Sequence, residues 1–263
     1  PPPPPPPPPA PPPARPASPG ARPLPSRGAI PGQGSLIPLA FDSAGPESAV
    51  ALVEYGRVLE AVHDEPRAHA RVVLSQVEAL LAQAGVSLGS LDAVAFGQGP
   101  GSFTGLRIAA GVAQGLALGA ALPVIPVSSL AALALAAHRK HSATRVLAAL
   151  DARMGEVYWG AYRIGADDLP AAETADQISL PHEVQLPGPG DWAGAGSAWT
   201  VWPTLGAPAV RHSYPGLGSR PADLLRLAGR AWSAGETLDA AEALPVYLRE
   251  QVAKRVGEKG HGR

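Results

Sequence analysis

The chain has 263 residues, of which 46% are apolar, and a formal net charge of -1. This length and apolar content allow a substantial core, while the near-neutral charge gives no basic footprint for tight nucleic-acid binding by the chain alone. The lack of cysteine excludes a disulfide framework, thiolate metal sites and a cysteine nucleophile. Because neither a long apolar run nor a signal peptide is found, we expect no membrane span and a cytoplasmic location.

The chain opens on a proline-rich head, residues 1–34, which begins with nine prolines. This composition buries too little apolar area to offset the entropy of ordering, so we expect disorder with polyproline II character. A linker, or upstream sequence translated from a mis-assigned start, is the simplest interpretation. A ligand for a proline-recognising groove is the alternative.

From residue 35 onward, short strands and amphipathic helices alternate, which predicts an α/β fold. Three strands come first, followed by a helix, a fourth strand, a glycine-rich turn, a long helix, a fifth strand and an alanine-rich helix capped by Ser128. The segments before Ser128 are expected at residues 36–42, 49–54, 58–63, 68–84, 94–96, 97–102, 103–120 and 123–127.

A second cycle opens after residue 140 with two strands around a turn. A stretch rich in Pro, Gly and Trp follows, which we expect to form irregular sheet and loops, then a helix with Pro at its start and a last short strand. These segments are expected at residues 145–150, 157–163, 165–218, 221–234 and 245–249. The charged tail from Lys254 is expected to fray. We therefore predict a first lobe over 35–140 and a smaller second lobe over 141–263.

The glycine-rich segment from Gly97 to Arg107 is the sharpest local signal. Glycines between a strand and a helix let backbone N–H groups turn toward an anion at the helix start. The segment is not a Walker loop, because no Gly-Lys-Ser/Thr follows, and Thr104 stands where a dinucleotide fingerprint needs its last glycine. Anion binding and a tight turn capped by Ser102 or Thr104 are both compatible with this pattern.

Within the long helix, a glycine recurs every four residues beside a second stripe of alanines. The two stripes are Gly111, Gly115 and Gly119, and Ala109, Ala113 and Ala117. A mid-helix glycine costs about 1 kcal/mol relative to alanine, so its use favours positions where two backbones approach closely. We expect this helix to pack both on its sheet and on another helix. The spacing does not tell whether that second helix belongs to the same chain.

Two aspartates, Asp42 and Asp151, end the first strand of each half. Two-lobed sugar-kinase and actin-like folds place a carboxylate near a phosphate at such a strand end, but Asp there also hydrogen-bonds its own turn. The seven histidines give no convincing metal pair, since His138 and His141 flank two basic residues. No Gly-x-Ser-x-Gly elbow is present, which argues against a serine hydrolase.

Two motifs, AFGQGPGSFTGLRI at 95–108 and DARMGEVYW at 151–159, resemble the TsaB (YeaZ) family in order and spacing, as do Pro123 and residues 114–117 and 127–130. Weaker similarity extends from residue 36 to residue 249. The resemblance marks a loop of Gly99, Pro100, Gly101, Ser102, Phe103, Thr104 and Gly105, and a second-lobe motif of Asp151, Arg153 and Glu156.

This resemblance implies an actin-like ATPase fold (ASKHA, ribonuclease-H-like) with two lobes and a degenerate nucleotide site. It also implies a non-catalytic partner of TsaD, the subunit that transfers threonylcarbamoyl to adenosine 37 (t6A) of tRNAs reading codons that begin with A. The implied partners are TsaD in a heterodimer, the TsaE ATPase in a larger complex, a second copy when alone, and tRNA only through the complex. ATP and metal are expected on partner subunits, with no cofactor bound by this chain alone.

Two departures bear on these expectations. In TsaD, two helix-spaced histidines bind the metal at the positions of Ser129 and Leu133 here, and neither replacement can serve as an imidazole ligand. Family members read Asp-Thr-x-Thr-Glu after the first strand, whereas Asp42 is followed by SAGPE. A nucleotide contact by Asp42 is therefore not expected.

Family likeness places the helices at 68–84 and 103–120 side by side, so that they could pair with the same two helices of TsaD or of a second copy in a four-helix bundle. The expected partner-binding residues are Val73, Val77, Leu80, Arg107, Gly111 and Gly115. Because one surface would serve both assemblies, TsaD should displace the homodimer.

Two enzymatic alternatives stay open at this point. Likeness to metal-dependent glycoproteases and to TsaD suggests an activity of the chain's own, against which the missing histidine pair argues. A small-molecule kinase would need a complete phosphate loop in each lobe and an adenosine-binding Gly-Gly turn, and neither lobe shows the full set.

Overall fold

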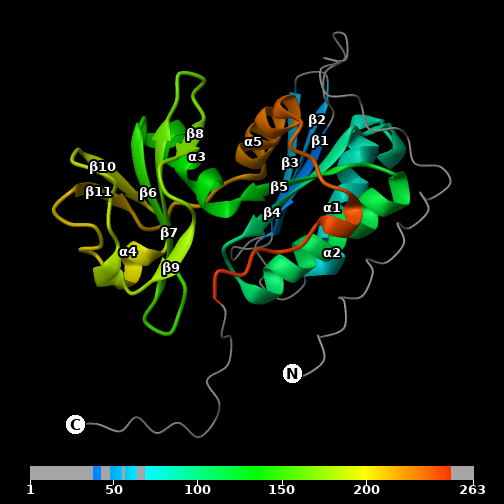
Figure 1. Cartoon of the computed structure of the whole chain (residues 1–263). Helices are drawn as coiled ribbons and strands as arrows, with labels where there is room; N and C mark the ends of the chain where they lie inside the picture. Colours follow the sequence, from blue (N-terminus) through cyan, green and yellow to red (C-terminus); the bar gives the residue numbers. More distant parts are fainter. Residues whose placement is uncertain (1–37, 43–47, 55–56, 64–68, 250–263) are drawn as a thin grey trace, which may run out of the picture.

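The computed structural model describes residues 38–42, 48–54, 57–63 and 69–249. These residues form two β-sheets with helices, arranged as two lobes side by side (Figure 1). The predicted α/β class is therefore confirmed. The proline-rich head, the turn after Asp42 and the charged tail lie outside the described residues.

The first lobe is built on a five-stranded sheet of order β3-β2-β1-β4-β5. The first three strands pair antiparallel, whereas β1, β4 and β5 run parallel. The strands are β1 (Pro38–Asp42), β2 (Ser48–Glu54), β3 (Arg57–His63), β4 (Ala93–Gly99) and β5 (Val124–Ser128). The helices that follow in this half are α1 (His69–Ala84), α2 (Phe103–Ala120) and α3 (Ser129–His141).

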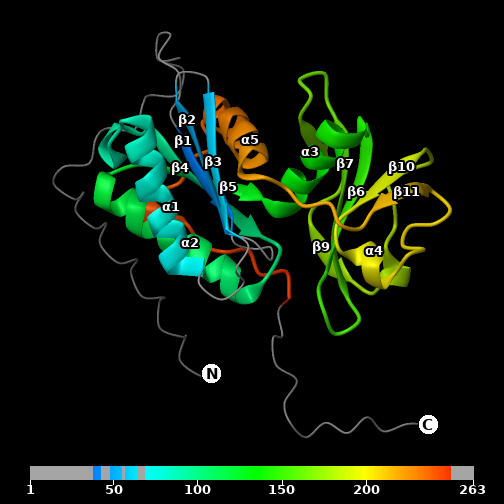
Figure 2. The ribbon, with the colours of Figure 1, turned by 180° about the vertical axis from the view of Figure 1, so that it is seen from behind.

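Alternation along β1 sends neighbouring side chains to opposite faces of this sheet. Leu39 and Phe41 pack with residues of α1 and α2, while Ala40 packs with residues of α5 (Pro221–Ala234). Figures 1 and 2 both show α1 and α2 on one face and α5 on the other. Both faces of the first sheet are thus covered by helices.

The second lobe repeats the strand order of the first. Its path is β11-β10-β6-β7-β8, with β9 also paired to β7. Strands β6, β10 and β11 run parallel, and β7 is antiparallel to β6 and β8, as in the first sheet. The elements are β6 (Arg145–Asp151), β7 (Val157–Ile164), β8 (Pro170–Ala172), β9 (Gln177–Ser179), β10 (Trp192–Ala195), α4 (Ala198–Val201) and β11 (Val210–Tyr214).

Two predictions about local structure have different outcomes. The stretch 165–218 forms the expected irregular sheet and loops, with four short strands of the second sheet and a short helix. Residues 245–249 form no strand, because Pro245 lacks an N–H and the segment makes one sheet contact, from the N–H of Val246 to the carbonyl of Gln98 at 2.9 Å.

The predicted boundary at residue 140 precedes the second sheet, but the covering helices cross it. Helix α3 packs on β6 and β7, whereas α5 packs back on β1, β2 and β5. The turn η3 (Ala240–Glu242) contacts α2, and Ala243 is buried in the first lobe's core. Much of 221–249 therefore belongs, by packing, to the first lobe.

A buried ion pair fastens the two crossing helices together. The guanidinium of Arg139 on α3 donates to both carboxylate oxygens of Asp223 on α5, at 2.9 and 3.0 Å. Asp223 is only 1% exposed and also accepts from the N–H of Arg220 at 2.9 Å. Hydrogen bonding to Asp223 raises the pKa of Arg139 and so favours its charged guanidinium.

Helix α2 is long and apolar enough to cross a membrane by length and composition, with a mean hydropathy of 1.2. Its alanine stripe packs in the core of the first lobe. The core helix of a soluble protein passes the same test, so α2 is weak evidence for a membrane span.

Candidate functional site

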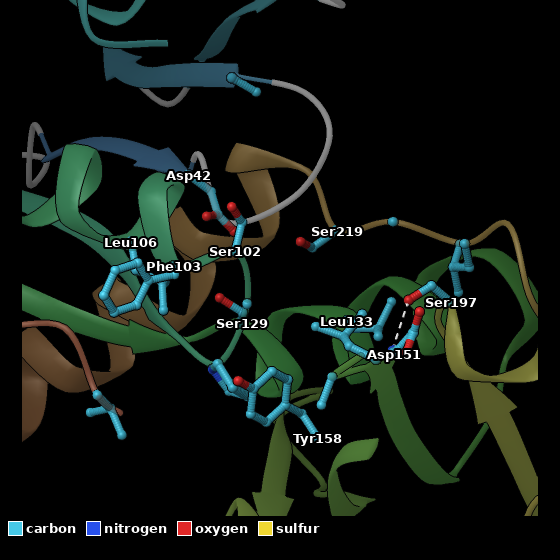
Figure 3. A pocket seen from close by; sticks show the side chains of 18 of the residues that line it. Asp42, Ser102, Phe103, Leu106, Ser129, Leu133, Asp151, Tyr158, Ser197 and Ser219 are labelled. Atoms are coloured by element: carbon cyan, nitrogen blue, oxygen red, sulfur yellow. Dashed lines mark hydrogen bonds between the residues drawn. The ribbon is translucent and has the colours of Figure 1, made fainter. Parts of the chain in front are cut away.

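A cleft of about 1090 Å³ lies between the lobes and is lined by strand ends and helix starts from both. Figure 3 shows Asp42 and Ser102 on the first-lobe wall, Asp151 and Ser197 on the opposite wall, and Ser129 between them. The two aspartates at equivalent strand ends thus line one cleft, which the sequence did not predict.

Asp42 ends β1 beside Gly97 of β4. A Cβ atom at position 97 would lie 2.6 Å from Oδ1 of Asp42, closer than real contacts allow. Glycine at this position lets the carboxylate lie against the neighbouring strand. One glycine of the sequence motif is therefore explained by its neighbour on the adjacent strand.

Asp151 organises its own turn. Its Oδ1 accepts from the N–H of Arg153 at 2.8 Å, and its Oδ2 lies 3.1 Å from the same residue's guanidinium. Its backbone N–H donates to Oγ of Ser197 at 3.1 Å. Asp151 therefore makes the turn-backbone hydrogen bond that its position allows, and its charge is balanced by Arg153.

A segment near the carboxyl end, residues 244–249, joins the two motif loops, and we call it the C-terminal strap. Val246 bonds to Gln98 in the first lobe. Arg249 forms an ion pair with Glu156 and donates to the carbonyl of Ala152 at 3.1 Å in the second. The sequence did not predict this pairing of Arg249 with Glu156 of the second-lobe motif, although the family resemblance extends to Arg249.

The glycine-rich loop closes as a capped turn. Oγ of Ser102 accepts from the N–H of Gly105 at 3.4 Å and so caps α2. Gly99 has a φ of 117°, and a Cβ there would lie 3.2 Å from the carbonyl oxygen of Val246. These contacts support the capped-turn interpretation of the loop. They leave anion binding untested.

A partly buried polar cluster at the junction of the lobes was not predicted from the sequence. Tyr162 of β7 donates from Oη to Asp176, and Ser128 donates to Oδ2 of the same carboxylate at 2.5 Å. Burial raises the pKa of Asp176, and burial followed by the nearby Asp176 charge raises the pKa of Tyr162. No local pattern marks these residues, because they are far apart in sequence.

The two positions at which the family resemblance puts metal ligands in TsaD, Ser129 and Leu133, lie on the first half of α3. Ser129 is 6% exposed, and its Oγ has no hydrogen-bond partner among the described residues. Leu133 is buried in the cluster under α3. Within the described ranges, no three His, Asp or Glu side chains lie close enough together to hold a metal ion.

Three of the six expected partner-binding residues do not lie at the surface. Val73, Val77 and Leu80 are buried in the chain's own core, where they pack with Leu39 and Phe41 of the first sheet. The prediction that these three side chains face a partner is therefore wrong. The stripe is periodic because α1 must cover its own sheet.

The glycine stripe of α2, in contrast, lies open. Added Cβ atoms at Gly111, Gly115 and Gly119 would meet nothing within 4 Å among the described residues. Neighbouring Leu118 is 77% exposed, while the alanine stripe is fully buried. Arg107, one turn before Gly111, is also exposed. The alanines thus pack on the sheet, and the glycines make no close helix contact within the described part of the chain.

Comparisons with known proteins agree with this architecture. A family model described as "TsaD: tRNA N6-adenosine threonylcarbamoyltransferase" matches residues 62–220. The tRNA threonylcarbamoyladenosine biosynthesis protein TsaB of Escherichia coli K12 is 43% identical over 220 residues, which cover 82% of this chain and 95% of that protein. Its namesake in Haemophilus influenzae is 35% identical over 83% of this chain and 95% of the relative.

Among solved structures, YeaZ from Pseudomonas aeruginosa superposes with a TM-score of 0.77 at 44% identity. The match covers 81% of this chain and 99% of that one. Together with the repeated strand order, this similarity confirms the predicted actin-like, ribonuclease-H-like fold with two lobes.

Proposed function

The chain belongs to the TsaB (YeaZ) family, and on this premise we propose that it serves threonylcarbamoyladenosine synthesis in tRNA as a non-catalytic subunit that binds TsaD. The curated relatives carry the name of this biosynthesis. Acting on tRNA, the chain would work in the cytoplasm. The larger complex would add the TsaE ATPase and would receive the tRNA.

The open glycine stripe of α2 carries the proposal of partner binding. Each helical glycine lowers helix stability by about 1 kcal/mol, and no close contact within the described residues offsets that cost at Gly111 or Gly115. Exposed Leu118 adds apolar area on the same helix. A helix of a homologous lobe, from TsaD or from a second copy, would fit against this surface in a four-helix bundle.

A non-catalytic role is supported by the walls of the cleft. Leu133 and Ser129 stand where TsaD has metal ligands, and Asp151 is already paired with Arg153. We therefore propose that ATP and metal act on the partner subunits. The rival activity, a transferase or glycoprotease reaction by this chain alone, predicts ATP hydrolysis or modified adenosine from the purified chain. Assays for both products decide between the two.

Partner binding is tested by placing a large side chain on the stripe. Gly115→Leu should weaken TsaD binding by about tenfold or more, because the helix backbones could no longer approach closely. The fold should survive, since position 115 has open space around it. Gly229→Leu on α5, also a helical glycine with nothing within 4 Å, is the matched control and should bind normally.

Titration calorimetry with purified TsaD provides the affinities, and circular dichroism verifies the fold. Equal binding by the wild type and Gly115→Leu would remove the stripe from the interface. A homodimer that persists when excess TsaD is added would show that the two assemblies use different surfaces.

A further inference from the structure

Two aromatic rings lie exposed at the mouth of the cleft. Phe103 begins α2 and Tyr247 lies on the C-terminal strap, with their ring centroids 5.7 Å apart at 44°. Their exposed fractions are 41% and 44%, and both residues line the cleft. Large rings of this kind usually contribute to the core, so a paired exposed position calls for a ligand that uses their faces.

Arg107 completes this aromatic cluster with a positive charge. Its guanidinium carbon lies 3.4 Å from the centroid of Phe103 and 5.5 Å from that of Tyr247. Among the described residues no carboxylate pairs with it, whereas the nearby Arg153 and Arg249 are both paired. The rings therefore hold a guanidinium whose charge is still available to an anion.

The sequence beyond the C-terminal strap is basic. The last ten residues, which begin five positions after Arg249 and lie outside the described ranges, contain one acidic and four basic residues. These are Glu258, and Lys254, Arg255, Lys259 and Arg263. Since the whole chain has a net charge of -1, this end is far more basic than the rest.

From these observations we infer that the cluster of Phe103, Arg107 and Tyr247 contacts unpaired nucleotides of a tRNA loop. Exposed aromatic faces stack on unpaired bases, and arginine pairs with phosphate, which is the combination that proteins use for single-stranded RNA. Because no carboxylate in the described part of the chain pairs with Arg107, the cluster favours a polyanion over an apolar protein surface. The inference rests on the proposed function, because that function brings tRNA to the complex.

The test measures two affinities for each variant of the full chain. Fluorescence anisotropy with a labelled, unmodified tRNA follows RNA binding by the complex with TsaD, and by the chain alone at low salt. Calorimetry follows TsaD binding. Phe103→Leu and Tyr247→Leu remove a stacking face but keep apolar volume, so each should weaken tRNA binding about tenfold. Arg107→Gln should reduce the salt dependence by about one ion.

Arg226→Ala is the control, because Arg226 is exposed on α5, across the first sheet from α2, and should leave tRNA binding unchanged. Unchanged tRNA affinity in both aromatic variants overturns the inference. A parallel loss of TsaD affinity also overturns it, because the cluster would then belong to the protein interface. If the wild type does not bind TsaD, the proposed function fails, and the RNA measurements on the chain alone still decide this inference.

Discussion

The two lobes share one strand order but bury the corresponding faces of their sheets in different ways. The first lobe covers Leu39 and Phe41 with two full helices, α1 and α2. The second covers Leu147 and Ala149 with the short helix α4 and with tryptophans. These are Trp159 and Trp199, with Trp202 partly buried against them.

This difference supports the proposed place of partner binding. A helix that covers a sheet has an outer face as well as an inner one, and α2 keeps small residues on that outer face. The tryptophans on β7, in α4 and just after α4 fill space over the second sheet without presenting a long helical surface. The two lobes therefore present different surfaces, although they share one strand order.

The largest effect should come from removing a tryptophan of the second lobe. Trp199→Ala should lower the free energy of unfolding by about 4 kcal/mol, because the ring is buried and lies over Gly194. Leu118→Ala on the first lobe should cost little, since that side chain is 77% exposed. Urea unfolding followed by circular dichroism measures both. Similar losses in the two variants would contradict the contrast between the lobes.

The next largest loss of stability should come from breaking the ion pair between α3 and α5. Arg139→Ala should destabilise the chain by about 3 kcal/mol, because it leaves Asp223 buried without its partner. Arg211→Ala breaks an exposed pair with Asp191 and should change the unfolding free energy by less than about 1 kcal/mol. If Arg139→Ala costs no more than Arg211→Ala, the crossing helices are not fastened by this contact.

Much of the first lobe was predictable because its residues repeat at helical or strand spacing. The range of α2 was predicted correctly, and α1 begins within one residue of the predicted start. Irregular sheet was predicted for 165–218, but the individual strands were not, because they are short and lie among Gly and Pro, so their pairing depends on distant neighbours.

The candidate site was predicted only in part, for a related reason. Periodicity identified the apolar stripe of Val73 and Val77 but not its direction, which the sheet beneath α1 decides. The two strand-end aspartates were found because each ends the first strand of its half of the sequence, but their place in one cleft depends on the packing of the two lobes. Contacts between residues far apart in sequence, such as Arg249 with Glu156, leave no local pattern to detect.

A smaller effect should appear at the junction of the lobes as a dependence on pH. Burial raises the pKa of Asp176 above its ordinary value of 3.8, so the folded state holds this proton more tightly than the unfolded state. Its stabilising contribution is full below pH 3.8 and is lost as pH rises through the folded pKa. The slope cannot exceed about 1.4 kcal/mol per pH unit.

Asp176→Asn removes this titration and serves as the comparison. The melting temperature of the wild type should fall relative to that of Asp176→Asn as pH rises above 4, by differential scanning calorimetry. A constant difference between the two proteins from pH 4 to pH 8 would show that Asp176 does not titrate in this range.

The smallest expected effect is a gain in stability on the first lobe. Gly111→Ala should stabilise the isolated chain by up to about 1 kcal/mol, because the added methyl group meets nothing and alanine favours helix. Gly97→Ala should instead destabilise it, since its Cβ would meet the carboxylate of Asp42. The melting temperatures of both variants test these two expectations. A loss of stability in Gly111→Ala would mean that the glycine stripe of α2 is not open.

The central claim is that the first lobe, and not the second, presents its outer helix face to TsaD. Because the chain has no cysteine, single substitutions Leu118→Cys on α2 and Val201→Cys on α4 place one exposed thiol on each lobe. The rate of maleimide labelling at each thiol, measured by mass spectrometry with and without saturating TsaD, compares the two surfaces. We predict that TsaD slows labelling about tenfold or more at position 118 and leaves position 201 unchanged. Equal rates at position 118 with and without TsaD, or protection at position 201 alone, would contradict the account.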